Sequence, residues 1–387
     1  MRLSKKIFIF SASALVLVIF FGGIYFLLFK PESQPENQTG DITEKIKDSV
    51  LENIPLAKPP VEEIISAITD KAIHSPVLSP DGQSIKYYAK DTGKVFELDI
   101  LSEKNKLVSD TDLPGLLQVS WSPDATKVLS EFSGPENRSV FSLYDYTQKK
   151  AARLNGNIDA ATWQSNNKII YKYFDPTTKK GSINVADPDG SNWTKITDIS
   201  TANLSIAPIP MTGLISFWNK ADSSTATLLQ STSILSGEKK DLIKGVFGAD
   251  FLWSPDGNLI LESSVDKKGG SKLDLGIVNN LGKEYKSLGI PTLISKCAWS
   301  RNSKFVYYAL PTSIPDGAVM PNDYMNNKFN TSDTFWKINI ETGEKTRLVE
   351  LDKIKAGYDA ASLFLNADES LLFFINRSDG KLYKIIL

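Results

Sequence analysis

Cysteine and histidine are almost absent from this sequence. Its 387 residues include one cysteine, Cys297, and one histidine, His74. A single cysteine excludes an intrachain disulfide and a cysteine-rich metal site, and a single histidine removes most histidine-dependent catalysis and zinc chemistry. We therefore expect a protein that is not an enzyme, with no cofactor, no catalytic residue and no metal site.

An excess of charge of one sign is also lacking. Lysine and arginine number 44 and aspartate and glutamate 45, which gives a formal net charge of −1. Binding to nucleic acid needs a clustered basic surface that releases counterions, so we expect no nucleic-acid partner. The sequence contains neither a G-x-x-x-x-G-K-S/T phosphate loop nor a G-x-S-x-G nucleophile elbow.

One long apolar run is present, from Ile7 to Phe29. At about 1.5 Å per helical residue it is long enough to cross a bilayer core of about 30 Å. A cleaved signal peptide is the competing interpretation, but its apolar core usually has about 7–15 residues. Because Arg2, Lys5 and Lys6 precede the run, the positive-inside rule predicts a single-pass protein of the cytoplasmic membrane, with its N-terminus in the cytoplasm and the rest extracytoplasmic.

The residues after the apolar run are polar and interrupted by prolines, which is typical of an extended linker. Apolar residues at helical spacing within it allow a short helix. The predicted organisation is a cytoplasmic tip and transmembrane signal anchor at 1–30, a linker at 31–61 and a folded domain at 62–387.

From residue 62 onward the sequence repeats a unit of about 45 residues. Each unit has an apolar strand, a turn that resembles Ser-Pro-Asp-Gly, and further strands. In such a turn proline fixes φ, aspartate bonds the local backbone and glycine accepts a positive φ. The copies of the turn are Ser79–Gly82, Trp121–Ala125, Trp163–Asn167, Pro208–Gly213, Trp253–Gly257, Trp299–Ser303 and Leu365–Glu369.

Four antiparallel strands in each unit of this length are typical of a propeller blade. The fold class predicted is all-β, a seven-bladed β-propeller with four-stranded antiparallel blades, preceded by one N-terminal transmembrane helix. The tryptophans that precede several turns are expected to pack between blades. The last unit ends at Leu387 after its third strand, so a strand at about 62–69 is predicted to complete it and close the ring.

Two segments, Val185–Asp198 and Trp253–Gly257, resemble the repeats of TolB-type, WD-like bacterial β-propellers. The resemblance covers residues 62–387 and identifies a type of repeat. It implies a binding scaffold at the cell envelope. The function expected is a membrane-anchored, extracytoplasmic, non-enzymatic scaffold for protein binding or envelope assembly, with protein partners in the cell envelope and a monomeric propeller.

One segment, Pro311–Asp333, departs from the repeat and is much longer than the corresponding connections in other units. Flexible methionine and aromatic side chains on a long loop suit contact with a partner. The competing interpretation is an insertion that folds over its own blade. The candidate partner-binding residues are Asp316, Met320, Asp323, Tyr324, Met325 and Phe329.

An enzyme with its site in the central channel, resembling a glycosidase or a lyase, is the alternative function, and a passive structural role in an envelope complex is a third. A channel site needs charged groups on the inner strands, and four residues at the upstream ends of those strands could supply them. They are Asp159, Asp250, Lys296 and Asp359. We expect His74 and Cys297 to be structural.

Overall fold

The computed structural model describes residues 63–387, apart from residue 202. The predicted membrane-spanning run, Ile7 to Phe29, and the predicted linker at 31–61 lie outside this part of the chain. Within the described residues almost all regular structure is β-strand. The one α-helix found there, α2 (Asn322–Met325), has four residues.

In the described part of the chain, no helix has the length and apolar character that crossing a membrane requires. A bilayer core about 30 Å thick needs about 20 apolar helical residues, whereas α2 has four. The predicted localisation, a single-pass protein of the cytoplasmic membrane with an extracytoplasmic propeller, is contradicted by this finding. The terms signal anchor and cell envelope lose their support with it.

The described strands form five four-stranded sheets and one seven-stranded sheet. In chain order the strands are β1 (Ile65–Ala67), β2 (Ile73–Leu78), β3 (Ser84–Ala89), β4 (Val95–Asp99), β5 (Asn105–Ser109), β6 (Leu116–Trp121), β7 (Lys127–Ser133), β8 (Ser139–Asp145), β9 (Lys150–Arg153), β10 (Ile158–Ser165), β11 (Lys168–Asp175), β12 (Lys180–Ala186), β13 (Thr194–Ile199), β14 (Leu204–Pro208), β15 (Leu214–Asn219), β16 (Ala226–Ser233), β17 (Lys239–Trp253), β18 (Leu259–Val265), β19 (Leu273–Asn279), β20 (Lys286–Ser287), β21 (Cys297–Trp299), β22 (Phe305–Pro311), β23 (Asp333–Asn339), β24 (Lys345–Arg347), β25 (Ala360–Leu365), β26 (Leu371–Asn376) and β27 (Leu382–Ile386). Three short 3₁₀ turns are η1 (Pro135–Asn137), η2 (Ile294–Lys296) and η3 (Leu351–Lys353).

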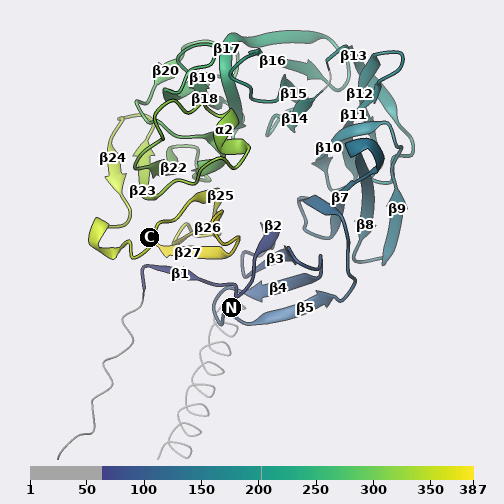
Figure 1. Ribbon diagram of the computed structural model, residues 1–387. Coiled ribbons are helices and arrows are strands. Elements are labelled where there is room, and N and C mark those ends of the chain that lie inside the picture. The colour runs from purple at the N-terminus through teal and green to yellow at the C-terminus, as the bar shows by residue number, and fades with distance from the viewer. Residues whose placement is uncertain (1–62, 202) are drawn as a thin grey trace, which may run out of the picture. The chain divides into compact units, whose positions relative to one another are not determined.

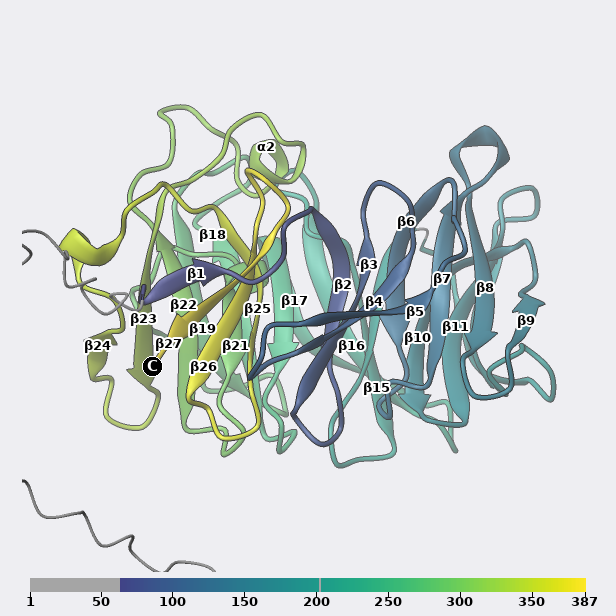
Figure 2. The same ribbon diagram turned by 90° about the horizontal axis from the view of Figure 1, so that it is seen from below.

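The sheets follow one another around a ring, and their strands pair in chain order (Figure 1). The sheet orders are β2-β3-β4-β5, β6-β7-β8-β9, β10-β11-β12-β13, β14 to β20, β21-β22-β23-β24 and β25-β26-β27-β1. Every pairing of neighbouring strands is antiparallel, so successive connections lie at opposite ends of the strands (Figure 2).

The last sheet combines the two ends of the described chain. Strand β1 pairs with β27 in the register Ile65 to Ile385 and Ala67 to Tyr383, and it lies along the outer side of β27 (Figure 1). The position is the one at which the sequence places a closing strand. Pairing the ends covers a sheet edge that would otherwise have free N–H and C=O groups.

The Ser-Pro-Asp-Gly turns join the first two strands of several sheets and satisfy their own polar groups. In the turn after β2, the Ser79 hydroxyl donates to Asp81 Oδ1 at 2.5 Å and accepts the N–H of Ser84 at 2.9 Å. Gly82 has a φ of 73°, in the left-handed region that glycine enters without a steric penalty. The repeated motif therefore predicts the turn correctly.

Tryptophans at the ends of inner strands connect neighbouring sheets. The indole N–H of Trp163 donates to the carbonyl of Ser120 at 2.8 Å, and that of Trp121 donates to the carbonyl of Ser75 at 2.9 Å. In each case the donor and the acceptor belong to consecutive sheets. These tryptophans are part of the packing between sheets, as predicted.

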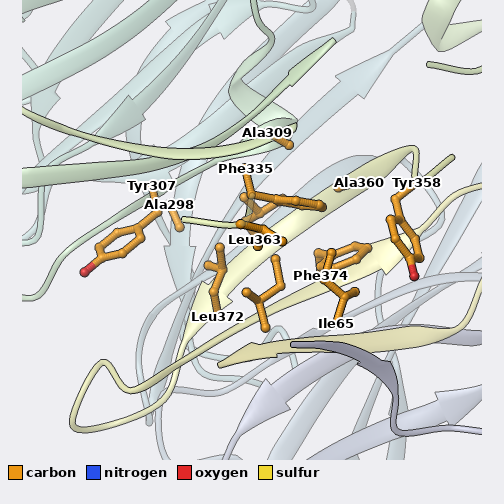
Figure 3. Close-up of a cluster of buried hydrophobic side chains, with 12 residues drawn as sticks. Ile65, Ala298, Tyr307, Ala309, Phe335, Tyr358, Ala360, Leu363, Leu372 and Phe374 are labelled. Carbon is orange, nitrogen blue, oxygen red and sulfur yellow. The ribbon is translucent and has the colours of Figure 1, made fainter. Parts of the chain in front are cut away.

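The core is divided into clusters between adjacent sheets, and one of them contains the closing strand (Figure 3). In this cluster Phe335 of β23 and Phe374 of β26 lie with their ring centroids 5.0 Å apart. Ile65 of β1, with 5% of its surface exposed, packs into the same cluster. Burial of apolar surface contributes about 25 cal/mol per Å², so β1 adds core packing as well as hydrogen bonds.

The seven-stranded sheet has an unusual strand, β17, of 15 residues. Its first part pairs with β16 and its second part pairs with β18. Phe247 belongs to both ladders, opposite Ala226 in one and Val265 in the other. The same backbone thus ends one group of strands and begins the next.

Candidate functional site

The predicted partner-binding residues all lie in the connection between β22 and β23, which includes α2 (Figure 2). Their exposure varies widely. By burial they divide into buried Met320 and Tyr324, half-buried Asp323 and Phe329, and exposed Asp316 and Met325. Tyr324 and Met320 therefore lie beneath the surface, and Asp316 and Met325 are the members that solvent reaches.

This connection extends over the neighbouring seven-stranded sheet. The Asn322 amide donates to Asp222 Oδ1 at 3.0 Å and accepts the N–H of Ser223 at 2.9 Å. The N–H of Met320 donates to the carbonyl of Gly270 at 3.1 Å. The loop is consequently fastened to two connections of another sheet as well as to its own.

A buried ionic network lies beneath the loop, centred on Lys296 at the end of η2. The side chain of Lys296 is fully buried, as are those of Asp333 and Asp359. Its ammonium donates to Asp333 Oδ2 at 2.6 Å and to Asp359 Oδ1 at 2.7 Å. It also donates to the Thr331 hydroxyl at 3.0 Å and the Ala360 carbonyl at 2.9 Å.

Tyr324 and Arg377 complete the network. The Tyr324 hydroxyl donates to Asp359 Oδ1 at 2.6 Å. The Arg377 guanidinium lies 3.9 Å from the centroid of the Tyr324 ring, and the Lys296 ammonium lies 5.0 Å from it. Cations near an aromatic ring are attracted by its quadrupole, so the Tyr324 ring attracts both positive charges.

The two carboxyl groups of this network differ in their ionisation. Burial raises the pKa of both, but for Asp359 the charge of Lys296 and several hydrogen bonds outweigh burial and lower the pKa below its ordinary value. For Asp333 burial prevails and the pKa is raised. Among the described residues Asp333 Oδ1 has no hydrogen-bond partner. Burial alone would lower the pKa of Lys296, but the two carboxylates hold it above its ordinary value.

Two of the four candidates for a channel enzyme, Lys296 and Asp359, are thus brought together. Both side chains are fully buried and neutralise each other. Each of these two charges is therefore paired inside the fold.

The other two candidates are also paired. Asp159 accepts a hydrogen bond from Lys172 at 2.5 Å, and the Lys172 side chain is fully buried. Asp250 accepts the indole N–H of Trp218 at 2.9 Å, and burial raises its pKa. No single locus gathers the four residues.

The substitution Asp250→Asn should preserve or raise the free energy of unfolding at pH 7. The raised pKa of the Asp250 carboxyl means that the folded chain binds this proton more tightly than the unfolded chain does. The stability that the bound proton contributes is fully present below about pH 3.8 and is lost as the pH rises through the raised pKa. Asp250→Asn keeps an acceptor for Trp218 and cannot ionise. Urea unfolding between pH 4 and 7 should show a flatter profile for Asp250→Asn than for exposed Asp352→Asn, and a large loss of stability at pH 7 would contradict this expectation.

A cavity of about 580 Å³ opens among the upstream parts of β6, β10 and β14, and we call it the rim cavity. Its lining mixes charges of both signs with aromatic and amide groups. The Glu131 carboxylate in it accepts hydrogen bonds from Gln118 and from the Ser139 hydroxyl. The lining includes Gln118, Glu131, Arg138, Asp159, Phe174 and Lys220.

Metal ligands are not assembled in the part of the chain that the structure describes, where no three His, Cys, Asp or Glu side chains converge. The segment Asp187–Asn192 forms a turn, closed by the N–H of Gly190 and the carbonyl of Asp187 at 2.8 Å.

Cys297 is buried, and burial raises the pKa of its thiol. His74 is half-buried in β2.

The sequence pattern indicates only some of these paired groups. Lys172 lies within the apolar and aromatic part of β11, between Ile169 and Phe174, and a lysine at such a position indicates a buried ion pair. Asp333 and Arg377 had no comparable indication, because each lies at the end of a strand where polar residues are common.

No protein-family model matches the sequence, and a search of curated proteins found no match to it. Solved structures do share its fold. An oligogalacturonate lyase in complex with manganese superposes with a TM-score of 0.60 at 13% identity, over 84% of this chain and 93% of that one. The propeller domain of Cps50 (Swd1) from Myceliophteria thermophila gives 0.53 at 11% identity, over 84% of this chain and 99% of that one. The fold is a β-propeller.

A third solved structure with a similar fold is the propeller domain of a protease. The propeller domain of the Trilobed protease from Pyrococcus furiosus has an open velcro topology, and it superposes with a TM-score of 0.53 at 12% identity, over 81% of this chain and 92% of that one. In the present propeller β1 pairs with β27 across the two ends. At such identities the likeness extends to the fold alone, and it does not reach the TolB-type repeat or the activity of any of these proteins.

Proposed function

We propose that this propeller is a non-enzymatic protein-binding module whose partner contacts the face that carries the β22–β23 connection. The observation that supports this most is the internal pairing of the charged groups at the upstream ends of the inner strands. Lys296, Asp333 and Asp359 are fully buried and neutralise one another, so they are not placed to transfer protons to a substrate, whereas Asp159 is paired with Lys172 but keeps 37% of its side chain exposed. Loops on a rigid scaffold, by contrast, are where recognition usually occurs.

We also infer that the ring has seven blades of the TolB-like, WD-like type that the repeats resemble. Division of the seven-stranded sheet at Phe247 gives two four-stranded groups, because β17 pairs on one side with β16 and on the other with β18. With the five four-stranded sheets this makes seven units. We further propose residues 62–387 as the propeller domain and 31–61 as a linker.

The second candidate is an enzyme that acts on a saccharide in the rim cavity. The cavity has an appropriate size for a ligand and contains the carboxyl groups of Glu131 and Asp159. An oligogalacturonate lyase shares the fold. Turnover of oligogalacturonate by the purified chain would favour this candidate over the first.

Two exposed methionines on opposite faces provide the test of partner binding. Met325 lies in the second-to-third connection of its sheet with 54% of its surface exposed, and Met211 lies in a first-to-second turn with 89% exposed. A charge in an apolar contact opposes binding, so Met325→Glu should lower crosslinked partner recovered from cells tenfold or more, whereas Met211→Glu should change it less than twofold.

Both variants should melt at the temperature of the unmodified chain, because both side chains are exposed. Equal recovery from the two variants, or a loss confined to Met211→Glu, would place the binding surface elsewhere and contradict the proposal.

A further inference from the structure

A second cavity, of about 490 Å³, lies on the outer strands of the β10–β13 sheet, and we call it the outer-strand cavity. The pairing register of β11, β12 and β13 explains which residues line this cavity. Tyr171 is opposite Asn184, which is opposite Lys195, and Tyr173 is opposite Ser182. Because residues two apart on a strand share a face, these side chains form one surface. Its lining has one residue, Ile158, in common with the rim cavity, and none with the β22–β23 connection.

Trp193 lines this cavity and differs from every other tryptophan of the chain. All seven tryptophans lie within the described residues, and Trp193 has 61% of its surface exposed. Its indole N–H has no partner among those residues. The other six each donate their indole N–H to a protein acceptor: Trp121, Trp163, Trp218, Trp253, Trp299 and Trp336.

Two tyrosines add further free donors. Tyr171 is 6% exposed, and its hydroxyl has no hydrogen-bond partner in the described part of the chain. The Tyr173 hydroxyl accepts a hydrogen bond from the Asn157 amide at 3.0 Å, which leaves its own proton available. Neither hydroxyl oxygen belongs to the fully buried atoms that lack a partner, so both donors are open to a ligand that accepts hydrogen bonds.

Several acceptors of the cavity are engaged by neighbouring groups, whereas Asp189 Oδ2 has no hydrogen-bond partner among the described residues. The Asn184 side chain is bonded to Ser182, whose hydroxyl donates to Asn184 Oδ1 at 3.2 Å. Asp189 Oδ1 accepts both the N–H and the hydroxyl of Ser191, at 2.9 and 2.6 Å. The cavity therefore offers aromatic surface and free donors, with few free acceptors.

We propose that the outer-strand cavity binds a proline-rich peptide segment in the polyproline II conformation. Proline has no N–H to donate, and a polyproline II segment has no internal hydrogen bonds, so its carbonyls are free to accept. Its rings pack against aromatic side chains, and aromatic-lined grooves are the usual sites for such segments. A saccharide fits less well, because its hydroxyls would also need acceptors.

Fluorescence anisotropy of labelled decaproline with the full chain tests the proposal. We expect saturable binding accompanied by a change in tryptophan fluorescence, because Trp193 is the exposed indole. Trp193→Ala should weaken binding tenfold or more. Tyr171→Phe, which removes only a hydroxyl, should weaken it threefold or more. The control Leu235→Ala, at a side chain 97% exposed on another sheet, should leave binding unchanged.

Three results would overturn the proposal: no saturable binding at millimolar decaproline, equal binding by Trp193→Ala, or binding of cellohexaose in place of decaproline. A glycine-serine peptide of equal length serves as the control for non-specific association. Because these variants lie away from Met325, loss of decaproline binding is distinguishable from loss of the partner proposed above.

Discussion

Replacement of Lys296 by methionine should lower the free energy of unfolding by about 3–5 kcal/mol. Methionine has a similar length, so packing changes little, but the carboxyl groups of Asp333 and Asp359 lose the cation that both contact. Burial of a charge without its partner is far more costly than the loss of a surface ion pair. Asp359 would keep Tyr324 and Arg377 as neighbours, which limits the loss.

Chemical denaturation of the full chain measures this effect, with Lys304→Met as the matched control. Lys304 is paired with Glu341 at 3.6 Å, and both side chains are more than half exposed. Pairs of this kind contribute about 0–1 kcal/mol. If the two substitutions cost the same, the network around Lys296 does not stabilise the propeller as its geometry implies.

The pH dependence of the Lys296 effect has a definite sign. The lowered pKa of Asp359 contributes stability that is present above about pH 3.8 and is lost as the pH falls through the lowered value. The raised pKa of Lys296 contributes stability below about pH 10.5 that is lost as the pH rises through the raised value. Lys296→Met should therefore destabilise the chain most between these limits.

Deletion of Glu63–Thr69 should destabilise the propeller by more than about 3 kcal/mol, or prevent it from folding. The deletion removes Ile65 and Ile68, which are 5% and 7% exposed. Full burial of one such side chain contributes about 1.5–3 kcal/mol. It also leaves the outer side of β27 unpaired, and a free edge invites association with another chain.

Point substitutions in β1 test its contribution to stability even if the chain that lacks Glu63–Thr69 does not fold. Ile65→Ala should cost about 2–4 kcal/mol, because Ile65 packs into the cluster of Figure 3. Ala67→Ser should change stability by less than about 0.5 kcal/mol, because Ala67 is exposed. Equal unfolding midpoints for these two variants would show that β1 contributes little to ring closure.

Local repeats in the sequence predicted the sheet-forming elements well. The Ser-Pro-Asp-Gly turns contain their own hydrogen bonds, as at Ser79 and Asp81, so the structure of each depends on a few neighbouring residues. The tryptophans before these turns were assigned to packing between sheets, and Trp163 does pack there. A structural feature that depends only on residues of one repeat can therefore be predicted from the sequence of that repeat.

The network beneath the β22–β23 connection could not be predicted in this way. Lys296 and Asp359 are 63 residues apart, and Tyr324 joins them from a loop that has no counterpart in other repeats. An aromatic residue on a long polar loop resembles an exposed contact residue, whereas Tyr324 is 3% exposed because two cations and a carboxylate hold it inward. The sequence offers Lys296 and Asp359 only as candidates for a channel site, and their mutual neutralisation depends on the tertiary fold.

Strand β17 has a mechanical consequence for the ring. The other neighbouring sheets of the described chain share no strand, so each of those seams can open without breaking a strand ladder. At Phe247 one extended backbone belongs to both ladders, and the strands from β14 to β20 form a continuous elastic element. Strain applied to one half of that element passes to the other half through the peptide chain itself. The β22–β23 connection is fastened to Asp222 and Gly270 on this element, so it rests on the arc in which one strand continues from one ladder into the next.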